Sequence, residues 1–279
     1  MTASPDRTIA ATPAASHILE VLSATKYYPV PGGARVTAVD DVTFRMKPGE
    51  ILGVVGESGS GKSTLSRIVA RLIDQDEGRV IFDGTDISTV SGPKFSTMAK
   101  RRLLQMVFQD PLESLNPRFR AVDAIANPVL RLGTAEERGN VAQVVRDAAA
   151  LAGLPERLLD SYPYQLSGGQ RARIGIARAI VLKPKLIILD EPTSALDASL
   201  QAHVIQTLLH LREQLGVALI FVSHDLNLVR LISDRLLVMH FGKIVEQGGA
   251  QEVFENPQAD YTRTLISAIP KLGRRRARA

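Results

Sequence analysis

Positions 56 to 64 read Gly56-Glu57-Ser58-Gly59-Ser60-Gly61-Lys62-Ser63-Thr64, directly after the apolar run 51–55. This order is typical of a strand, a glycine-rich loop and a helix. Gly56 and Gly61 permit backbone angles that turn successive N–H groups inward, Lys62 adds a positive charge, and the Ser63 hydroxyl is placed to ligate Mg²⁺. The stretch therefore predicts a cradle for phosphate groups.

The residues that follow this loop support the same interpretation. Leu65, Ile68, Val69 and Leu72 recur at helical spacing, so we expect a helix whose N-terminus points its partial positive charge at the bound anion. A glycine turn that matched by accident would lack both the strand before it and the helix after it. The chain has one such loop and no internal repeat, which predicts one nucleotide cassette per chain.

Composition narrows the classes of function. The 279 residues are 45% hydrophobic and 23% charged, as in ordinary globular proteins, and contain no Cys, which excludes a disulfide scaffold and a thiolate-bound iron–sulfur cluster. The net charge of +5 falls to +1 without the four arginines at 274, 275, 276 and 278, so nothing demands a nucleic-acid partner. The longest apolar runs, such as 217–222, have the length of strands, whereas a membrane-spanning helix needs about 18 residues.

The pattern along the chain predicts an α/β protein of the P-loop type. We expect a disordered leader at 1–17, a main domain at 18–249 with a mostly helical insertion at about 110–182, and an extension at 250–279 that ends in the basic tail. Strands are expected ahead of the loop as an antiparallel sheet, and later as buried parallel strands and a closing hairpin. The expected strand ranges are 18–22, 36–46, 79–82, 104–108, 186–189, 217–222, 235–239 and 243–246.

Helices are expected at 141–151 and 156–159, and on both sides of the break at Asn256-Pro257. A further helix carries the apolar stripe Leu200, Val204, Leu208, Leu211 and Leu215, and Gly216 stands where a C-terminal cap belongs.

Two polar positions follow buried strands. Asp190 comes after the strand 186–189, where a carboxylate can hold Mg²⁺ through water, and the adjacent Glu191 can orient an attacking water. His224 follows the next strand, where an imidazole can donate to a γ-phosphate. The alternatives, a solvated turn for the carboxylates and a structural role for the histidine, are weakened by the phosphate loop.

A second glycine pair opens another helix. Ser167, Gly168, Gly169 and Gln170 precede apolar residues at helical spacing, which predicts a second anion-binding helix end. One nucleotide already has its phosphates wrapped by the first loop. The second element could therefore serve a nucleotide that is bound to another copy of the chain.

Tyr27 and Tyr28 lie between the first two predicted strands, where one ring could stack on a nucleotide base. Their position alone does not separate this role from that of a half-buried strand aromatic.

Taken in order, these motifs resemble the ATP-binding subunits of ABC transporters over about residues 18–249. The resemblance implies that Lys62 and the loop amides bind ATP phosphates, that Ser63, Gln109 and Asp190 attend Mg²⁺, and that Tyr28 stacks on the base. It makes Glu191 similar to the catalytic carboxylate and His224 to the switch histidine. Asp197, in the run 194–197, resembles the residue that couples two sites across a head-to-tail dimer.

A narrower resemblance is carried by 108–111 with 114–118, by Tyr162-Pro163, and by Tyr261-Thr262-Arg263 within 261–270. These are similar to ATPase subunits of oligopeptide and dipeptide importers, a group that includes nickel and glutathione systems. Some members carry a C-terminal cysteine cluster for an iron–sulfur centre. This chain resembles the type of subunit without it.

The resemblance implies a peripheral protein at the cytoplasmic face of the membrane. Its expected partners are two integral membrane permease subunits, a second ATPase subunit of the same or a paralogous chain, and, through the complex, an extracytoplasmic solute-binding protein. Two rivals stay open: a soluble ABC protein of DNA repair or translation, and a P-loop nucleotide kinase. The first usually has paired cassettes or long coiled-coil insertions, and the second does not need residues 166–170.

Overall fold

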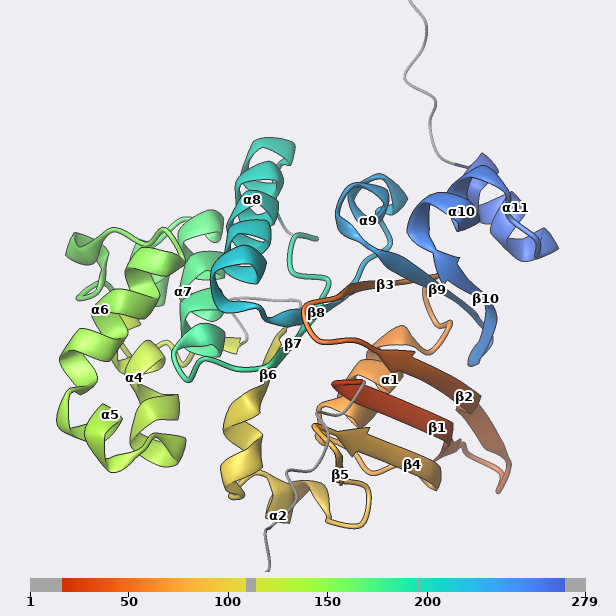
Figure 1. The fold of residues 1–279 in the computed structure, drawn as a ribbon, viewed down its shortest axis with the longest axis horizontal. Helices are drawn as coiled ribbons and strands as arrows, with labels where there is room; N and C mark the ends of the chain where they lie inside the picture. The colour runs from red at the N-terminus through yellow and green to blue at the C-terminus, as the bar shows by residue number, and fades with distance from the viewer. Residues whose placement is uncertain (1–16, 109–113, 195, 269–279) are drawn as a thin grey trace, which may run out of the picture.

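The computed structural model describes residues 17–108, 114–194 and 196–268. The predicted leader up to Ser16, Gln109 and the basic tail lie outside these residues. Within them the chain forms two sheets and a group of helices (Figure 1). No helix in this part of the chain is long and apolar enough to cross a membrane.

The first sheet is antiparallel, with strand order β2-β1-β4-β5. Its strands are β1 (Leu19–Pro29), β2 (Arg35–Met46), β4 (Glu77–Phe82) and β5 (Thr85–Asp86). Tyr27 and Tyr28 belong to β1 itself, opposite Thr37 and Val36, so the prediction that they lie between two strands was wrong. The strand continues because its ladder with β2 persists up to Pro29.

The second sheet has the order β10-β9-β3-β8-β7-β6 and is parallel except for the edge strand β10. Its strands are β3 (Ile51–Val55), β6 (Leu104–Val107), β7 (Leu186–Asp190), β8 (Ala218–Val222), β9 (Arg235–His240) and β10 (Lys243–Gly249). Every residue of β3, β7 and β8 is buried, as the uninterrupted apolar runs predict. The predicted P-loop fold with a mostly parallel sheet is confirmed.

Helices α1 (Lys62–Val69), α8 (Ala198–Leu215) and α9 (Leu226–Ile232) follow strands of this sheet. Leu72 was predicted on the first of these helices, but α1 ends before it and its side chain is 44% exposed. The helix cannot continue because Arg71 adopts a left-handed backbone, with φ +56°. Gly216 caps α8 as predicted, with φ +63° and an N–H bond to the Arg212 carbonyl.

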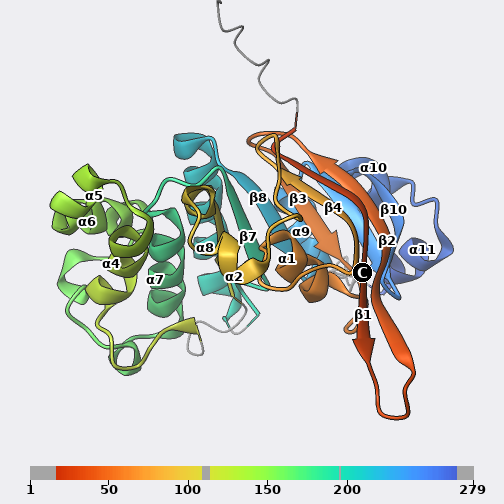
Figure 2. The same ribbon diagram turned by 90° about the horizontal axis from the view of Figure 1, so that it is seen from below.

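In the described part of the chain between β6 and β7, four helices gather at one side of the molecule (Figures 1 and 2). They are α4 (Ala121–Leu132), α5 (Ala135–Gly139), α6 (Val141–Leu151) and α7 (Gly168–Ile180). Helix α4 was not predicted because Pro128 lies inside it; burial of Ala121, Ile125 and Val129 against the neighbouring helices outweighs the lost backbone bond. Residues 156–158 form a 3₁₀ turn after Pro155, in place of the predicted helix.

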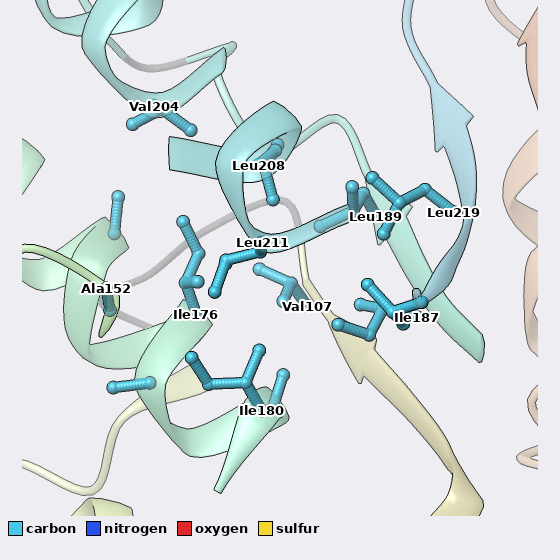
Figure 3. Close-up of a cluster of buried hydrophobic side chains, with 14 of the residues drawn as sticks. Val107, Ala152, Ile176, Ile180, Ile187, Leu189, Val204, Leu208, Leu211 and Leu219 are labelled. Carbon is cyan, nitrogen blue, oxygen red and sulfur yellow. The ribbon is translucent and has the colours of Figure 1, made fainter. Parts of the chain in front are cut away.

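A continuous apolar cluster joins α4, α6 and α7 to the parallel sheet. Figure 3 shows Ile176 and Ile180 of α7, Leu208 and Leu211 of α8, and Leu189 of β7 in this cluster, with Leu211 beside Ile176. The remaining elements are the short helix α2 (Gly92–Phe95), the 3₁₀ turns 99–103 and 163–165, and the C-terminal helices α10 (Ala250–Glu255) and α11 (Asp260–Ser267). Helices α10 and α11 lie beside the β9–β10 hairpin (Figure 1).

Candidate functional site

The glycine-rich loop connects the buried strand β3 to α1, as predicted. Gly56 and Gly61 have φ of +150° and +102°, and a Cβ on either would lie 2.2 Å from a backbone oxygen, that of Met239 or Ala38. Gly59 also has a positive φ, of +82°. Only glycine fits the first two positions, because both the backbone angle and the close approach exclude a side chain. The sequence therefore fixes the shape of the cradle.

Lys62 lies within the curve of this loop. Its ammonium donates to the carbonyl oxygens of Gly56 and Glu57 at 2.7 and 2.8 Å, and to Ser60 Oγ at 3.4 Å. Burial lowers the pKa of Lys62, and the carboxylate of Glu191 is the strongest of the charges that oppose this shift. A buried cation that is held only by neutral oxygens is suited to an anionic ligand.

Ser63 and Asp190 bring the loop and the end of β7 together. The Ser63 hydroxyl donates to Asp190 Oδ1 at 3.1 Å, and Asp190 is only 4% exposed. Burial raises the pKa of Asp190, while the Ser63 hydroxyl and the charge of Arg67 act in the opposite direction. A hydroxyl and a buried carboxylate are oxygen ligands of the kind that Mg²⁺ takes, so these two residues fit the predicted metal site. Gln109, the third predicted ligand, lies outside the described residues.

Glu191 and His224 follow neighbouring parallel strands, β7 and β8. Glu191 Oε2 lies 3.2 Å from His224 Nδ1, and the Glu191 backbone N–H donates to the Val222 carbonyl at 3.0 Å. Glu191 has a left-handed backbone, with φ +49°, which is strained for a side chain of this kind. The arrangement places one carboxylate and one imidazole where they can share or move a proton.

The second glycine element is the N-terminus of α7. Ser167 Oγ accepts from the Gln170 N–H at 3.3 Å, and the Gln170 side chain accepts from the Ser167 N–H at 2.9 Å, which forms a capping box. Gly169 is buried, and a Cβ there would lie 2.9 Å from Leu200 Cδ2 of α8. Gly169 thus has a packing role that the sequence did not indicate.

Asp197 and Tyr28 occupy defined positions away from the loop. Asp197 Oδ1 accepts from the Leu200 N–H at 2.9 Å and so caps the N-terminus of α8. Tyr28 is 38% exposed, with the Lys26 ammonium 5.9 Å from its ring centroid. The neighbouring Tyr27 hydroxyl instead donates to Glu77 at 3.1 Å, which leaves Tyr28 as the better candidate for stacking on a base.

Comparison with known proteins identifies the family of this chain. The family model "ABC transporter" matches residues 39–194, which include the glycine-rich loop, Asp190 and Glu191. The chain belongs to the ABC transporter family, as an ATP-binding domain. It is accordingly an ATPase of the ABC type.

Curated relatives are similar over most of their length. The chain is 45% identical to the oligopeptide transport ATP-binding protein AppF of Bacillus subtilis, covering 91% of this chain and 78% of the relative. It is 47% identical to OppF of Escherichia coli, covering 84% and 69%. Among solved structures, the ABC cassette MJ0796, a dimer in a post-hydrolysis state with ADP and Pi, matches with a TM-score of 0.74 and 30% identity, covering 83% and 98%.

Two contacts of the ABC phosphate loop were missed by sequence reasoning. The Gly242 N–H donates to the Ser60 carbonyl at 3.0 Å, and the Glu57 N–H donates to Tyr261 Oη at 3.0 Å. Both partners are far from the loop in sequence. A signal was available only for Tyr261, which lies in the segment that resembles the peptide-importer group.

Proposed function

We propose that this chain is the ATP-hydrolysing subunit of an importer that takes up di- or oligopeptides. The observation that carries the proposal is the convergence of Lys62, the Ser63–Asp190 pair and the Glu191–His224 pair at the ends of β3, β7 and β8. The names of the relatives at 45% and 47% identity support peptide as the solute. Nickel, glutathione and other solutes are the less favoured alternatives.

In this proposal the residues of the loop bind ATP. The N–H groups of the loop and the N-terminus of α1 bind the phosphate oxygens, and Lys62 exchanges its carbonyl contacts for phosphate. Tyr28 stacks on the base. Ser63, Asp190 and Gln109 would hold Mg²⁺, which would supply positive charge to neutralise the phosphates.

Glu191 and His224 perform the proton chemistry. Glu191 orients the attacking water and accepts its proton, for which its carboxylate is sheltered but within reach of the site. His224 holds that carboxylate and donates to the γ-phosphate. Glu191 has a left-handed backbone, which costs stability. Such a cost is typical of active-site residues, whose side chains must point in a fixed direction.

The second half of the site comes from another ATPase subunit. Ser167, Gly168, Gly169 and Gln170 bind the nucleotide held by the opposite subunit, and Asp197 couples the two sites. The Ser167 oxygen caps its own helix, but its O–H can still donate to a phosphate. The dimeric state of the related cassette MJ0796 supports this arrangement.

The proposal also covers the domain organisation, the location and the partners of the chain. Residues 18–249 form the ATPase domain with helices at about 110–182 as a subdomain, and 250–279 form an extension. The chain lies at the cytoplasmic face of the membrane and drives two permease subunits, which receive solute from an extracytoplasmic binding protein. Gln109 links ATP binding to the helices that grip the permeases.

The test is co-purification with the membrane subunits, followed by uptake of a labelled tripeptide in reconstituted vesicles. We expect ATP-dependent uptake that Lys62→Ala abolishes, because that variant lacks the loop cation. Lys94→Ala, at an exposed position on α2, is the matched control and should transport normally. Uptake of nickel or glutathione in place of the peptide would overturn the solute, and failure to bind any membrane subunit would overturn the transport role.

A further inference from the structure

The C-terminal helix α11 reaches the phosphate loop. Tyr261, in its first turn, accepts a hydrogen bond through Oη from the backbone N–H of Glu57 at 3.0 Å, across 204 residues of sequence. Helix α11 lies outside the region 39–194 that matches the family model. The contact therefore links α11, which lies outside the matched region, to Glu57 of the glycine-rich loop.

The same tyrosine is connected to a second support of the loop. Its ring stacks on His240, the last residue of β9, with centroids 3.8 Å apart and planes inclined by 13°. Two residues later, the Gly242 N–H donates to the Ser60 carbonyl at 3.0 Å, and the Gly242 carbonyl accepts from the Asp40 N–H at 2.9 Å. The loop is thus held at Glu57 by α11 and at Ser60 by the β9–β10 turn.

Helix α11 is itself fixed to the sheet. The carboxylate of Glu246, on β10, accepts from the backbone N–H groups of Gln258 and Ala259 at 2.8 and 3.0 Å. The Tyr261 ring packs against the main apolar cluster, together with Leu265 and Ile266. The hydroxyl is therefore presented to the loop from a rigid base, because its helix, its ring and its hydrogen bond are each constrained.

We propose that Tyr261 is a positioning residue of the nucleotide site, which holds the start of the phosphate loop in its binding shape through Glu57. A glycine-rich loop has many accessible conformations, and a ligand that must order it loses affinity. A support that orders the loop beforehand reduces this loss. The inference rests on the proposed function, since it assigns a role in binding Mg-ATP.

The test compares Tyr261→Phe with Tyr27→Phe in the full chain. The first change removes only the hydroxyl that meets Glu57 and keeps the ring that stacks on His240. The second removes a tyrosine hydroxyl that makes a bond of similar length, 3.1 Å to Glu77, on the antiparallel sheet. Calorimetric titration with Mg-ATP should show binding that is weaker by about two- to tenfold for Tyr261→Phe, which corresponds to the net free energy of one hydrogen bond. Tyr27→Phe should bind Mg-ATP as tightly as wild type.

Two further readouts separate positioning from a general loss of stability. Hydrogen exchange without nucleotide should accelerate at the Glu57 amide in Tyr261→Phe, while the melting temperature stays within about 2 °C of wild type. In the assembled transporter, KM for ATP should rise by about two- to tenfold with kcat retained. His240→Leu removes the ring that stacks on Tyr261. It should also accelerate exchange at the Glu57 amide and raise KM for ATP.

The outcomes distinguish this inference from the proposed function. If wild-type chain does not bind Mg-ATP, the proposed function fails. If wild type binds but Tyr261→Phe binds equally well with an unchanged exchange rate at Glu57, the nucleotide site stands and the role of Tyr261 is refuted. Equal weakening by Tyr27→Phe would also refute it, because the effect would not depend on the loop contact.

Discussion

Glu191 and His224 approach to 3.2 Å, between Oε2 and Nδ1, although 33 residues separate them in the sequence. The pairing of β7 with β8 brings them together, since Asp190 stands opposite Val222 in the ladder. The glutamate side chain is 17% exposed and the histidine 63%. The carboxylate is sheltered, whereas the imidazole lies at the surface, where it can meet both the carboxylate and a ligand.

We expect His224→Gln to lower ATP hydrolysis by about tenfold or more and to leave Mg-ATP binding nearly unchanged, because an amide lacks the two opposed ring nitrogens that let the imidazole contact Glu191 and the γ-phosphate together. Steady-state hydrolysis in the assembled complex and calorimetric binding measure the two effects. His210→Gln, on the exposed face of α8, is the control and should behave like wild type. A His224→Gln variant with full activity would exclude the histidine from the reaction.

Asp190→Asn should stabilise the ligand-free chain at neutral pH while impairing its use of Mg²⁺. Burial raises the pKa of Asp190, so its charged form costs stability that an isosteric amide does not, and the amide oxygen can still accept from Ser63. A gain of about 0.5–2 kcal/mol would raise the melting temperature by about 1–8 °C. A lower melting temperature at neutral pH would contradict this account.

The stability gain of Asp190→Asn should depend on pH. The folded-state pKa of Asp190 lies above the ordinary value of 3.8, so the protonated acid favours folding below that value. This contribution is lost as pH rises through the folded-state pKa. The difference in melting temperature between variant and wild type should therefore be small at acidic pH and grow toward neutral pH. A difference that is constant with pH would show that the carboxylate charge is not its cause.

Gly169→Ala should destabilise the chain by at most about 1 kcal/mol, because its Cβ would lie 2.9 Å from Leu200 Cδ2, the end of a half-buried side chain that can turn aside. Denaturant unfolding measures the change. Gly168→Ala is the matched control, since its Cβ would lie 3.3 Å from Leu196 Cδ2, and it should cost less. An equal cost at both positions would refute the packing role of Gly169.

This packing makes Gly168→Asp the better test of a shared site. Its carboxylate should repel ATP held by the opposite subunit, so the isolated chain should bind Mg-ATP normally while hydrolysis in the dimer is lost. Mixing it with Lys62→Ala should restore part of the activity, because one interface of a mixed dimer carries neither defect. In a heterodimer the two changes are divided between the partner chains. Loss of nucleotide binding by the isolated Gly168→Asp chain would contradict the shared site.

Much of the site was predictable because its determinants are local. Gly56, Gly61 and Lys62 are adjacent in sequence, and their backbone angles can be inferred from residue type. Asp190 and Glu191 follow a short, uninterrupted apolar run, which is typical of a buried parallel strand. The meeting of Glu191 and His224 then follows from the order of the parallel strands.

The parts that sequence did not reveal depend on distant contacts. Nothing near Tyr261 indicates that its hydroxyl meets Glu57, and nothing near Gly169 indicates Leu200. Pro128 disfavours a helix at this position, but α4 forms because its apolar residues are buried against neighbouring helices. Residue propensities cannot predict these contacts, because the contacts form when elements far apart in the chain pack together.

Glu191→Gln tests most sharply whether Glu191 accepts the proton of the attacking water. Gln keeps the size of the side chain and an oxygen for His224 but loses the basicity that removes a proton from water. Glu213→Gln, at an exposed position on α8, is the control. Where the two ATPase subunits are different chains, the matching residue of the partner is altered as well.

The measurement is the rate of Mg-ATP hydrolysis by the assembled complex, with nucleotide binding determined in parallel. We expect Glu191→Gln to bind Mg-ATP as tightly as wild type and to hydrolyse it about 10² to 10⁴ times more slowly. Hydrolysis at the wild-type rate would contradict this role of Glu191.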